Sequence, residues 1–141
     1  MKDCVFCQIV ENDTQASVVC SSEGVLAFMD IQPVNPGHVL VIPKHHASRL
    51  AELDEVTGGE LFRVAMRVVE GLKRSGLKCE GVNLYLADGE AAGQEVPHVH
   101  LHVIPRFKGD GFRIKFGPTY GFRPERKELD AVASRIREAM P

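Results

Sequence analysis

The chain has 141 residues, of which 44% are hydrophobic and 26% are charged, a composition typical of one soluble globular domain. Its 17 lysines and arginines are offset by 19 acidic residues, without a polybasic run, so we expect no nucleic-acid partner. No apolar stretch reaches the roughly 20 residues that a membrane span needs, and the N-terminus does not resemble a signal peptide. These features predict a cytoplasmic protein without a membrane partner.

Two apolar runs in the first third of the chain predict neighbouring strands. Val25–Met29 is the first, and His38–Ile42 is the second, ended by Pro43. Both runs are short and rich in aliphatic or β-branched side chains, which favours strand over helix. The prolines and the glycine between them, ending in Pro36 and Gly37, predict a turn.

The next segment, residues 54–75, has helical periodicity. Asp54 is a candidate N-cap, and Thr57 with Glu60 offers a capping box one turn later. Gly76 suits a C-cap in the left-handed conformation. Apolar residues recur every three or four positions, which predicts one buried face: Leu61, Ala65, Val68 and Leu72.

The second half of the chain adds two strands and a helix. We expect strands at Val82–Leu86 and Pro97–Ile104, separated by a polar loop. Residues 107–124 are rich in glycine and have no sustained period, so they predict a long loop that could cover a ligand. Apolar residues from Leu129 to Met140 predict an amphipathic C-terminal helix. The order of elements predicts an α+β fold with an antiparallel sheet, one long central helix and a C-terminal helix.

Three histidines alternate in the second of these strands. His98, His100 and His102 would share one face of the sheet at intervals of roughly 7 Å, because side chains alternate along a strand. Such a row could be a solvated strand face, a catalytic zinc site or a centre for nucleophilic catalysis. A neutral imidazole can attack phosphorus, and its neighbours can contact phosphate oxygens or a leaving group.

The sequence around these histidines resembles the histidine-triad (HIT) family of nucleotide-binding proteins. The motif His-φ-His-φ-His-φ-φ, where φ is apolar, matches residues 98–104. Three further segments resemble the family as well: Phe28-Met29-Asp30-Ile31-Gln32-Pro33, Gly37-His38-Val39-Leu40-Val41-Ile42-Pro43-Lys44-His45-His46 and Ala92-Gly93-Gln94. Together the matches cover residues 4–106.

The resemblance implies a HIT-like fold and a hydrolase that acts on the α-phosphate of purine nucleotide conjugates, either adenosine phosphoramidates or diadenosine polyphosphates. By analogy His100 is the nucleophile and forms a nucleotidyl-histidine intermediate, His102 contacts the phosphate or leaving group, and His98 orients its neighbour or binds metal. The implied nucleotide-binding residues are Phe28, Asp30, Ile31, Asn83, Gly93, Gln94 and His38. Two alternatives remain: a nucleotide-binding sensor or scaffold with weak catalysis, and a metal-dependent hydrolase.

The N-terminal Cys4-Val5-Phe6-Cys7 could be a free dithiol, a redox pair or half of a metal site. The resemblance favours a zinc site of the type found in bacterial relatives, because it supplies two more ligands at His46 and His98. A closed site with four ligands would make the Zn²⁺ ion structural. Cys20 and Cys79 have no partner at a recognisable spacing, and we expect them to be buried.

The resemblance also implies an organisation and a partner. We expect a single HIT domain over residues 1–141, with a zinc-binding segment at 1–24, a core at 25–106 and a loop and helix at 107–141. The implied assembly is a homodimer joined through the helix at 54–75 and the adjoining sheet edge. The sequence departs from many relatives at Ala87 and at Glu95, which stands where some relatives have a serine that helps protonate the leaving group. A carboxylate at that position would repel a polyphosphate.

Overall fold

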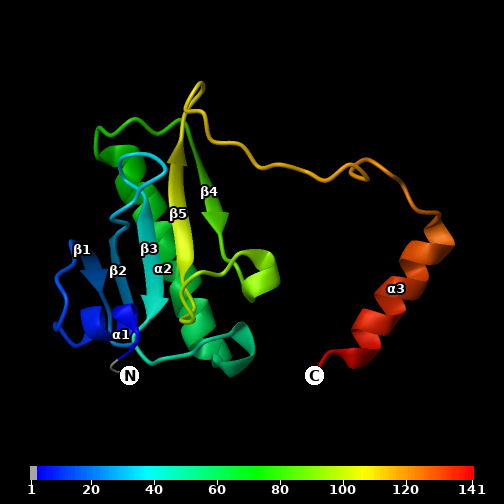
Figure 1. Ribbon diagram of the computed structural model, residues 1–141, viewed down its shortest axis with the longest axis horizontal. Coiled ribbons are helices and arrows are strands. Elements are labelled where there is room, and N and C mark those ends of the chain that lie inside the picture. Colours follow the sequence, from blue (N-terminus) through cyan, green and yellow to red (C-terminus); the bar gives the residue numbers. More distant parts are fainter. Residues whose placement is uncertain (1–2) are drawn as a thin grey trace. The chain divides into compact units, whose positions relative to one another are not determined.

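The computed structural model of the protein describes residues 3–141, which form two compact units, the first ending at Gly111 and the second spanning Phe112–Pro141. The first unit contains a five-stranded antiparallel sheet in the order β1-β2-β3-β5-β4 (Figure 1). The five strands are β1 (Val18–Ser21), β2 (Val25–Met29), β3 (Val39–Pro43), β4 (Gly81–Tyr85) and β5 (Leu101–Arg106). This architecture confirms the predicted α+β class.

One helix covers each face of this sheet. The long helix α2 (Glu55–Arg74) lies behind the sheet in Figure 1 and contacts β2, β3 and β5. The short helix α1 (Val5–Val10) packs against the other face. Two short 3₁₀ turns, η1 (Leu50–Glu52) and η2 (Glu90–Ala92), lie in the connections. The described residues contain no helix with the length and apolarity needed to span a bilayer.

Alternate side chains of β2 and β3 point to opposite faces of the sheet and belong to two separate hydrophobic cores. Val25 and Ala27 belong to the cluster under α2, whereas Leu26 and Phe28 belong to the cluster under α1. The side chains of β3 divide in the same way. Because both faces are covered, these strands have continuous apolar runs rather than alternating apolar and polar residues.

The predicted central helix agrees closely with α2. Asp54 is its N-cap, and its side chain accepts hydrogen bonds from the backbone N–H of Thr57 at 2.8 Å and from the Thr57 hydroxyl at 2.7 Å. Asp54, rather than a capping box at Thr57, therefore starts the helix. Gly76, just beyond the helix, has φ +83°, as expected for a left-handed residue after a C-terminus.

The strand predicted at Pro97–Ile104 is wrong at its start, because β5 begins only at Leu101. The N–H of Val99 donates to the carbonyl of Ala47 in a loop at 2.7 Å, so this part of the segment does not pair with a neighbouring strand. Only His102 of the three histidines lies within β5, although Val99, Leu101 and Val103 still share the core under α2. Helix α1 and strand β1, which are six and four residues long, were not predicted from the sequence.

The second unit contains helix α3 (Arg126–Ala139), which confirms the predicted C-terminal helix. Glu125 and Glu128 form a capping box at its start, and none of its residues is buried. No other helix or strand occurs in Phe112–Pro141.

Candidate functional site

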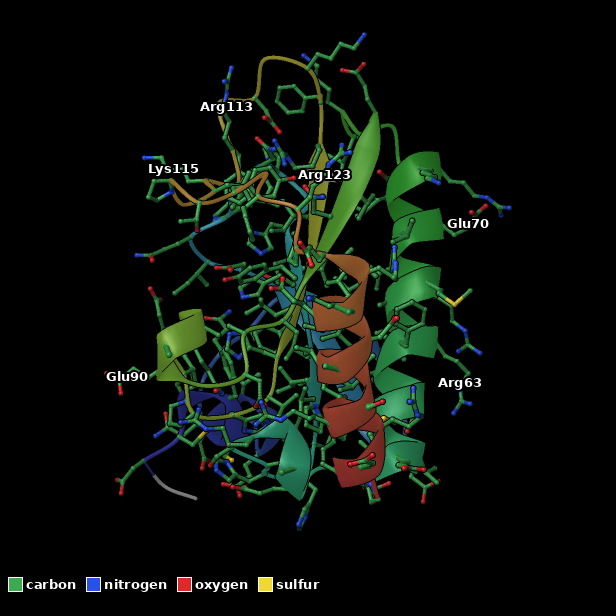
Figure 2. All side chains as sticks on the ribbon, turned by 90° about the vertical axis from the view of Figure 1, so that its right-hand side faces the viewer. Arg63, Glu70, Glu90, Arg113, Lys115 and Arg123 are labelled. Carbon is green, nitrogen blue, oxygen red and sulfur yellow. The ribbon has the colours of Figure 1, made fainter. Side chains whose placement is uncertain are left out.

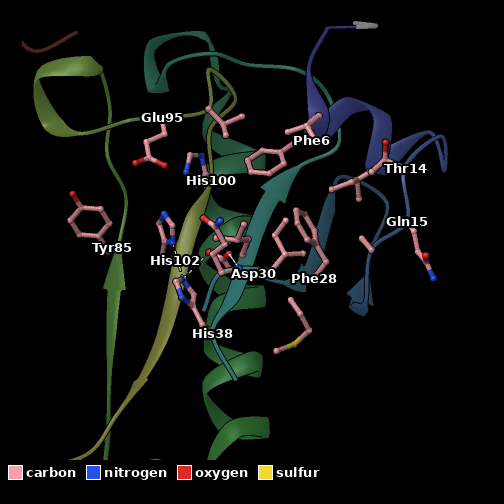
Figure 3. A pocket seen from close by; sticks show the side chains of 18 of the residues that line it. Phe6, Thr14, Gln15, Phe28, Asp30, His38, Tyr85, Glu95, His100 and His102 are labelled. Atoms are coloured by element: carbon pink, nitrogen blue, oxygen red, sulfur yellow. Dashed lines mark hydrogen bonds and ion pairs between the residues drawn. The ribbon is translucent and has the colours of Figure 1, made fainter. Parts of the chain in front are cut away.

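A row of side chains across the sheet forms the floor of a cavity of about 480 Å³. Strand register places Phe28 of β2 opposite Leu40 of β3, Leu40 opposite His102 of β5, and His102 opposite Tyr85 of β4. All four side chains line the cavity, which is large enough for a nucleotide-sized ligand. Figure 3 shows the histidines at its centre, with Phe28 on one side and Tyr85 on the other.

Helix α1 and the loop after it form the opposite wall. Phe6 lies edge-on to Phe28, with ring centroids 5.6 Å apart, and to His100, with centroids 5.2 Å apart. The same ring contacts His98 edge-on at 5.8 Å. Phe6 therefore contacts both the cavity, through His100, and His98, which lies outside the cavity lining. This role of Phe6 was not predicted, although the position of Phe6 between the predicted metal ligands Cys4 and Cys7 was a usable signal.

His100 is buried, lines the cavity and has a ring nitrogen free for chemistry. Its Nδ1 lies 2.7 Å from the backbone carbonyl of His98, an acceptor that requires a proton on Nδ1. In the neutral ring the lone pair is then on Nε2. A second-nitrogen contact of this kind fixes both the tautomer and the ring orientation. The hydrogen bond therefore prepares Nε2 of His100 to act as a nucleophile or base.

His38 and His102 form a hydrogen-bonded pair with a defined direction. The N–H of Val34 donates to Nδ1 of His38 at 3.0 Å, so the His38 proton lies on Nε2. That nitrogen is 2.9 Å from Nδ1 of His102, to which it donates. The remaining proton of His102 is then on Nε2. Neutral His102 thus has the opposite tautomer to His100: one ring presents a donor nitrogen and the other a lone pair.

Burial keeps this pair neutral. It lowers the pKa of His102 to about 4, with further lowering by the neighbouring His100 and His38 rings and an opposing effect from Asp30. Burial also lowers the pKa of His38, against the attraction of the Asp30 carboxylate, whose Oδ2 is 3.5 Å from Nε2 of His38. Near neutral pH, His102 is therefore suited to donate one hydrogen bond to an anionic oxygen.

This pKa shift predicts an acid-dependent loss of stability. Between pH 6.5 and 4 the unfolded chain binds a proton at His102 that the folded protein does not. The free energy of unfolding therefore decreases as the pH is lowered through this range. We expect His102 to contribute about 2 kcal/mol to this loss, discounted for its partial exposure. Urea denaturation at pH 7 and pH 4.5 should show a smaller loss in His102→Gln than in the unchanged protein. Equal losses would contradict the assignment of the shift to His102.

The structure brings together most, but not all, of the predicted nucleotide-binding residues. Those that line the cavity are Phe28, Asp30, Ile31, His38 and Gly93. Ile31 is 92% exposed at the rim, so it presents free apolar surface to a ligand. Asp30 accepts a hydrogen bond from the Gln32 N–H through Oδ1 at 2.8 Å.

Asn83 and Gln94 do not line the cavity. Asn83 lies on β4 and its Oδ1 accepts a hydrogen bond from Arg106 at 2.6 Å. Gln94 Nε2 donates to the backbone carbonyls of Ser48 at 2.8 Å and Val96 at 3.0 Å. Its Oε1 accepts from the Gly89 N–H and from Arg49. In this structure Gln94 therefore holds the loops around the cavity together. Ala87, a departure from the family pattern, is buried outside the lining.

A second cluster contains the four predicted metal ligands Cys4, Cys7, His46 and His98, whose ligand atoms all lie within 4.8 Å of one another. Cys4 Sγ is 3.4 Å and Cys7 Sγ 3.6 Å from Nδ1 of His98, and Cys7 Sγ is 3.2 Å from Nδ1 of His46. Bond lengths of about 2.3 Å for Zn–S and 2.0 Å for Zn–N place tetrahedral ligand atoms roughly 3.3–3.8 Å apart. The donor set and its spacing therefore fit one tetrahedral zinc ion.

The protonation of these groups also suits a cation. His98 Nε2 donates to the Pro43 carbonyl at 2.8 Å, which leaves the Nδ1 lone pair facing the two thiols. Burial lowers the pKa of His98, and a neutral ring is the form that binds metal. Burial and the adjacent Cys4 raise the pKa of the Cys7 thiol, a direction that a bound divalent cation would reverse.

Three further side chains, Asp30, His38 and His102, also bring potential ligand atoms within 4.8 Å of one another. Both nitrogens of His38 and Nδ1 of His102 already have partners, because His38 bonds both the Val34 N–H and His102. This set is therefore better described as a hydrogen-bonded network beside the cavity than as a second metal site. Cys20 and Cys79, which were expected to be buried, are instead half-buried.

Comparison with known proteins places these features in a family context. Residues 11–109 match the HIT domain. An uncharacterized HIT-like protein of Borreliella burgdorferi is 43% identical over 136 residues, covering 95% of this chain and 98% of that protein. An adenosine 5'-monophosphoramidase of Schizosaccharomyces pombe is 33% identical, covering 94% of this chain and 95% of its own length.

Solved structures agree with the fold. The crystal structure of a HIT family protein from Bacillus anthracis has a TM-score of 0.88 and 34% identity, covering 99% of this chain and 98% of that one. A zinc-bound histidine triad family protein from Mycobacterium smegmatis has a TM-score of 0.76 and 36% identity, with 99% of both chains covered.

Proposed function

The chain belongs to the HIT domain family, and from that premise we propose that it is a nucleotide hydrolase acting at the α-phosphate of purine nucleotide conjugates, through a covalent intermediate on His100. One observation carries this proposal. The hydrogen bond from His100 Nδ1 to the His98 carbonyl leaves the Nε2 lone pair available in a nucleotide-sized cavity. The phosphoramidase named among the relatives supports adenosine phosphoramidates as the substrate class.

The proposed reaction has two steps. Nε2 of His100 attacks phosphorus, the phosphorus–nitrogen bond breaks, and the amine departs with the electron pair and a proton from water. The nucleotidyl group on Nε2 makes the ring cationic, which strengthens the bond from Nδ1 to the His98 carbonyl. The hydroxide left by that water, or a second water that gives a proton to it, then attacks phosphorus, and the electron pair of the breaking phosphorus–nitrogen bond returns to Nε2. One water is consumed overall, its proton on the amine and its hydroxyl on phosphorus.

The other cavity residues would bind the nucleotide. Nε2–H of His102 is positioned to donate to a phosphate oxygen, in a network oriented by His38. We propose that Asp30 accepts hydrogen bonds from ribose hydroxyls and that Phe28 and Ile31 contact the base, since all three line the cavity and Asp30 lies on the Phe28 side of the histidines in Figure 3. Asn83 and Gln94 would act indirectly, by holding Arg106 and the loops.

We also propose that zinc occupies the site formed by Cys4, Cys7, His46 and His98, as in the bacterial zinc-containing type of the family. A bound ion would supply structural cross-linking rather than an activated water, since four protein ligands leave no open position. His98 would then be fixed from one side by its ligand role, while its carbonyl orients His100. All four cysteines are free in the described residues, and thiols stay reduced in a reducing compartment, which supports a cytoplasmic location.

Turnover in the presence of a chelator tests the mechanism against its metal-dependent alternative. The protein should release AMP and ammonia from adenosine 5'-phosphoramidate, and a chelator added during the assay should leave the initial rate unchanged. Immediate cessation would instead support a catalytic metal. Tight nucleotide binding with turnover no faster than background would support a sensor or scaffold.

We further propose a single HIT domain over residues 1–141, with the zinc-binding segment at 1–24, the core at 25–106 and the loop and helix at 107–141, assembled as a homodimer. Helix α2 supports the dimer because Val56, Phe62 and Met66 are 77%, 54% and 58% exposed on it. Strand β4 lies at one end of the sheet order and is an available edge.

The proposed dimer predicts the effect of a charge on α2. Phe62→Glu should convert the dimer to a monomer, because a carboxylate would be buried without a partner at the interface. Sedimentation velocity of the purified protein measures this directly. Val19→Glu is a matched control, since Val19 is a 47%-exposed apolar residue on β1 at the other edge of the sheet. Equal effects of the two substitutions, or a monomeric parent protein, would contradict the proposal.

A further inference from the structure

The cavity contains no permanent positive charge. Among its lining residues, all within the part of the chain that the structure describes, there is neither a lysine nor an arginine. Two carboxylates do line it, Asp30 and Glu95. Its histidines His38 and His102 have lowered pKa values caused by burial, so they add hydrogen-bond donors but no net charge near neutral pH. The cavity is therefore poorly suited to a ligand with several negative charges.

The two carboxylates lie on opposite sides of the histidines in the cavity (Figure 3). Asp30 is on the side of Phe28, where we have proposed that the nucleoside binds. Glu95 lies beyond the histidines, next to His100 and on the side of Tyr85 (Figure 3). Glu95 is exposed, at the mouth of the cavity. If the nucleoside occupies the first side and the α-phosphate lies at His100, the group that leaves phosphorus extends toward Glu95.

We propose that Glu95 is a specificity-determining residue, which selects nucleoside phosphoramidates whose amine leaving group carries a second, positively charged ammonium. This inference rests on the proposed function, and of the two substrate classes it favours phosphoramidates over diadenosine polyphosphates. A polyphosphate leaving group would bring several negative charges to the carboxylate of Glu95, with no lysine or arginine in the lining to offset them. An ammonium in the same place gains a favourable interaction with the carboxylate.

Two matched substrates test this role. Both are adenosine 5'-phosphoramidates of 1,4-diaminobutane: in one the distal amine is free and positively charged, and in the other it is acetylated and neutral. The measurement is the ratio of their kcat/KM values within each protein, so that a general loss of activity cancels. We expect a preference of about fivefold for the charged substrate, the upper range for one exposed charge pair. It should decrease when salt is raised, because salt screens exposed charges.

Glu95→Gln should reduce the ratio to about one and raise the turnover of diadenosine tetraphosphate relative to the neutral phosphoramidate. Glu90→Gln is the matched control, because Glu90 has the same charge, lies five residues away on η2, projects outward and does not line the cavity (Figure 2). This variant should keep the fivefold preference. An unchanged ratio in Glu95→Gln would overturn the role of Glu95 while leaving the proposed function intact. A lack of turnover of every phosphoramidate would overturn both.

Discussion

Replacing His100 by alanine should lower kcat for adenosine 5'-phosphoramidate by at least about 10³-fold while leaving the Kd for AMP within about threefold. The reason is that Nε2 of His100 is the one protein atom that bonds to phosphorus in the proposed mechanism. The nucleotide would still be held by the other lining residues, including Asp30 and His102. Steady-state kinetics and calorimetric titration with AMP measure the two quantities.

His45→Ala is a matched control for the loss of an imidazole. His45 is exposed and belongs neither to the cavity lining nor to the metal cluster. This variant should keep full activity. Substantial turnover by His100→Ala would exclude His100 as the nucleophile, and loss of AMP binding together with turnover would assign it to binding instead. Partial rescue of His100→Gly by added imidazole would support the nucleophilic role.

Loss of the metal should have the second-largest effect, on stability rather than on the chemical step. Cys7→Ser should not retain one zinc ion per chain, and its Tm should be about 10 °C lower. An ion present at 1,000 times its Kd adds about 4 kcal/mol to the free energy of unfolding, which corresponds to a shift of this size for a chain of this length. The physical reason lies at α1, where the N-cap residue Cys4 and the helix residues Phe6 and Cys7 pack against the sheet in one cluster. Elemental analysis and thermal denaturation give the two readouts.

Cys20→Ser separates the metal site from general effects of removing a thiol. Cys20 is half-buried on β1 and lies outside the metal cluster. It should leave the zinc content at one ion per chain and the Tm within about 2 °C. A metal-free parent protein with unchanged Tm would contradict the site. Phe6 contacts both the buried His98 and the cavity, so nucleotide affinity should weaken together with zinc loss.

The sequence predicts well those elements whose signal is local. The bounds of β2 are the predicted ones, and α2 differs by one residue at each end, because Asp54 and Gly76 mark its limits through their own side-chain and backbone chemistry. β3 is shifted by a single residue. The six-residue α1 is too short to establish a helical period, and its stability comes from contacts with the distant β2 and β3.

The part of the candidate site that the sequence predicts best is the set of three histidines, because one motif fixes both their identity and their spacing. The alternation of His98, His100 and His102 with apolar residues persists even though β5 begins at Leu101. What the local pattern could not supply is the set of long-range partners. The hydrogen bonds that draw Gln94 toward Ser48 and Asn83 toward Arg106 form between distant segments, and they place both side chains outside the cavity lining. Tyr85 enters the lining only through its register with His102.

Trapping the covalent intermediate tests the central claim most directly. The protein is mixed with excess adenosine 5'-phosphoramidate and quenched within milliseconds in alkaline denaturant, where a phosphorus–nitrogen bond to histidine survives. Digestion and mass spectrometry then identify the modified peptide. The account predicts an added adenylyl group on His100, formed and lost at rates fast enough for turnover. AMP production during a single turnover with no adduct on His100 at any time would contradict it.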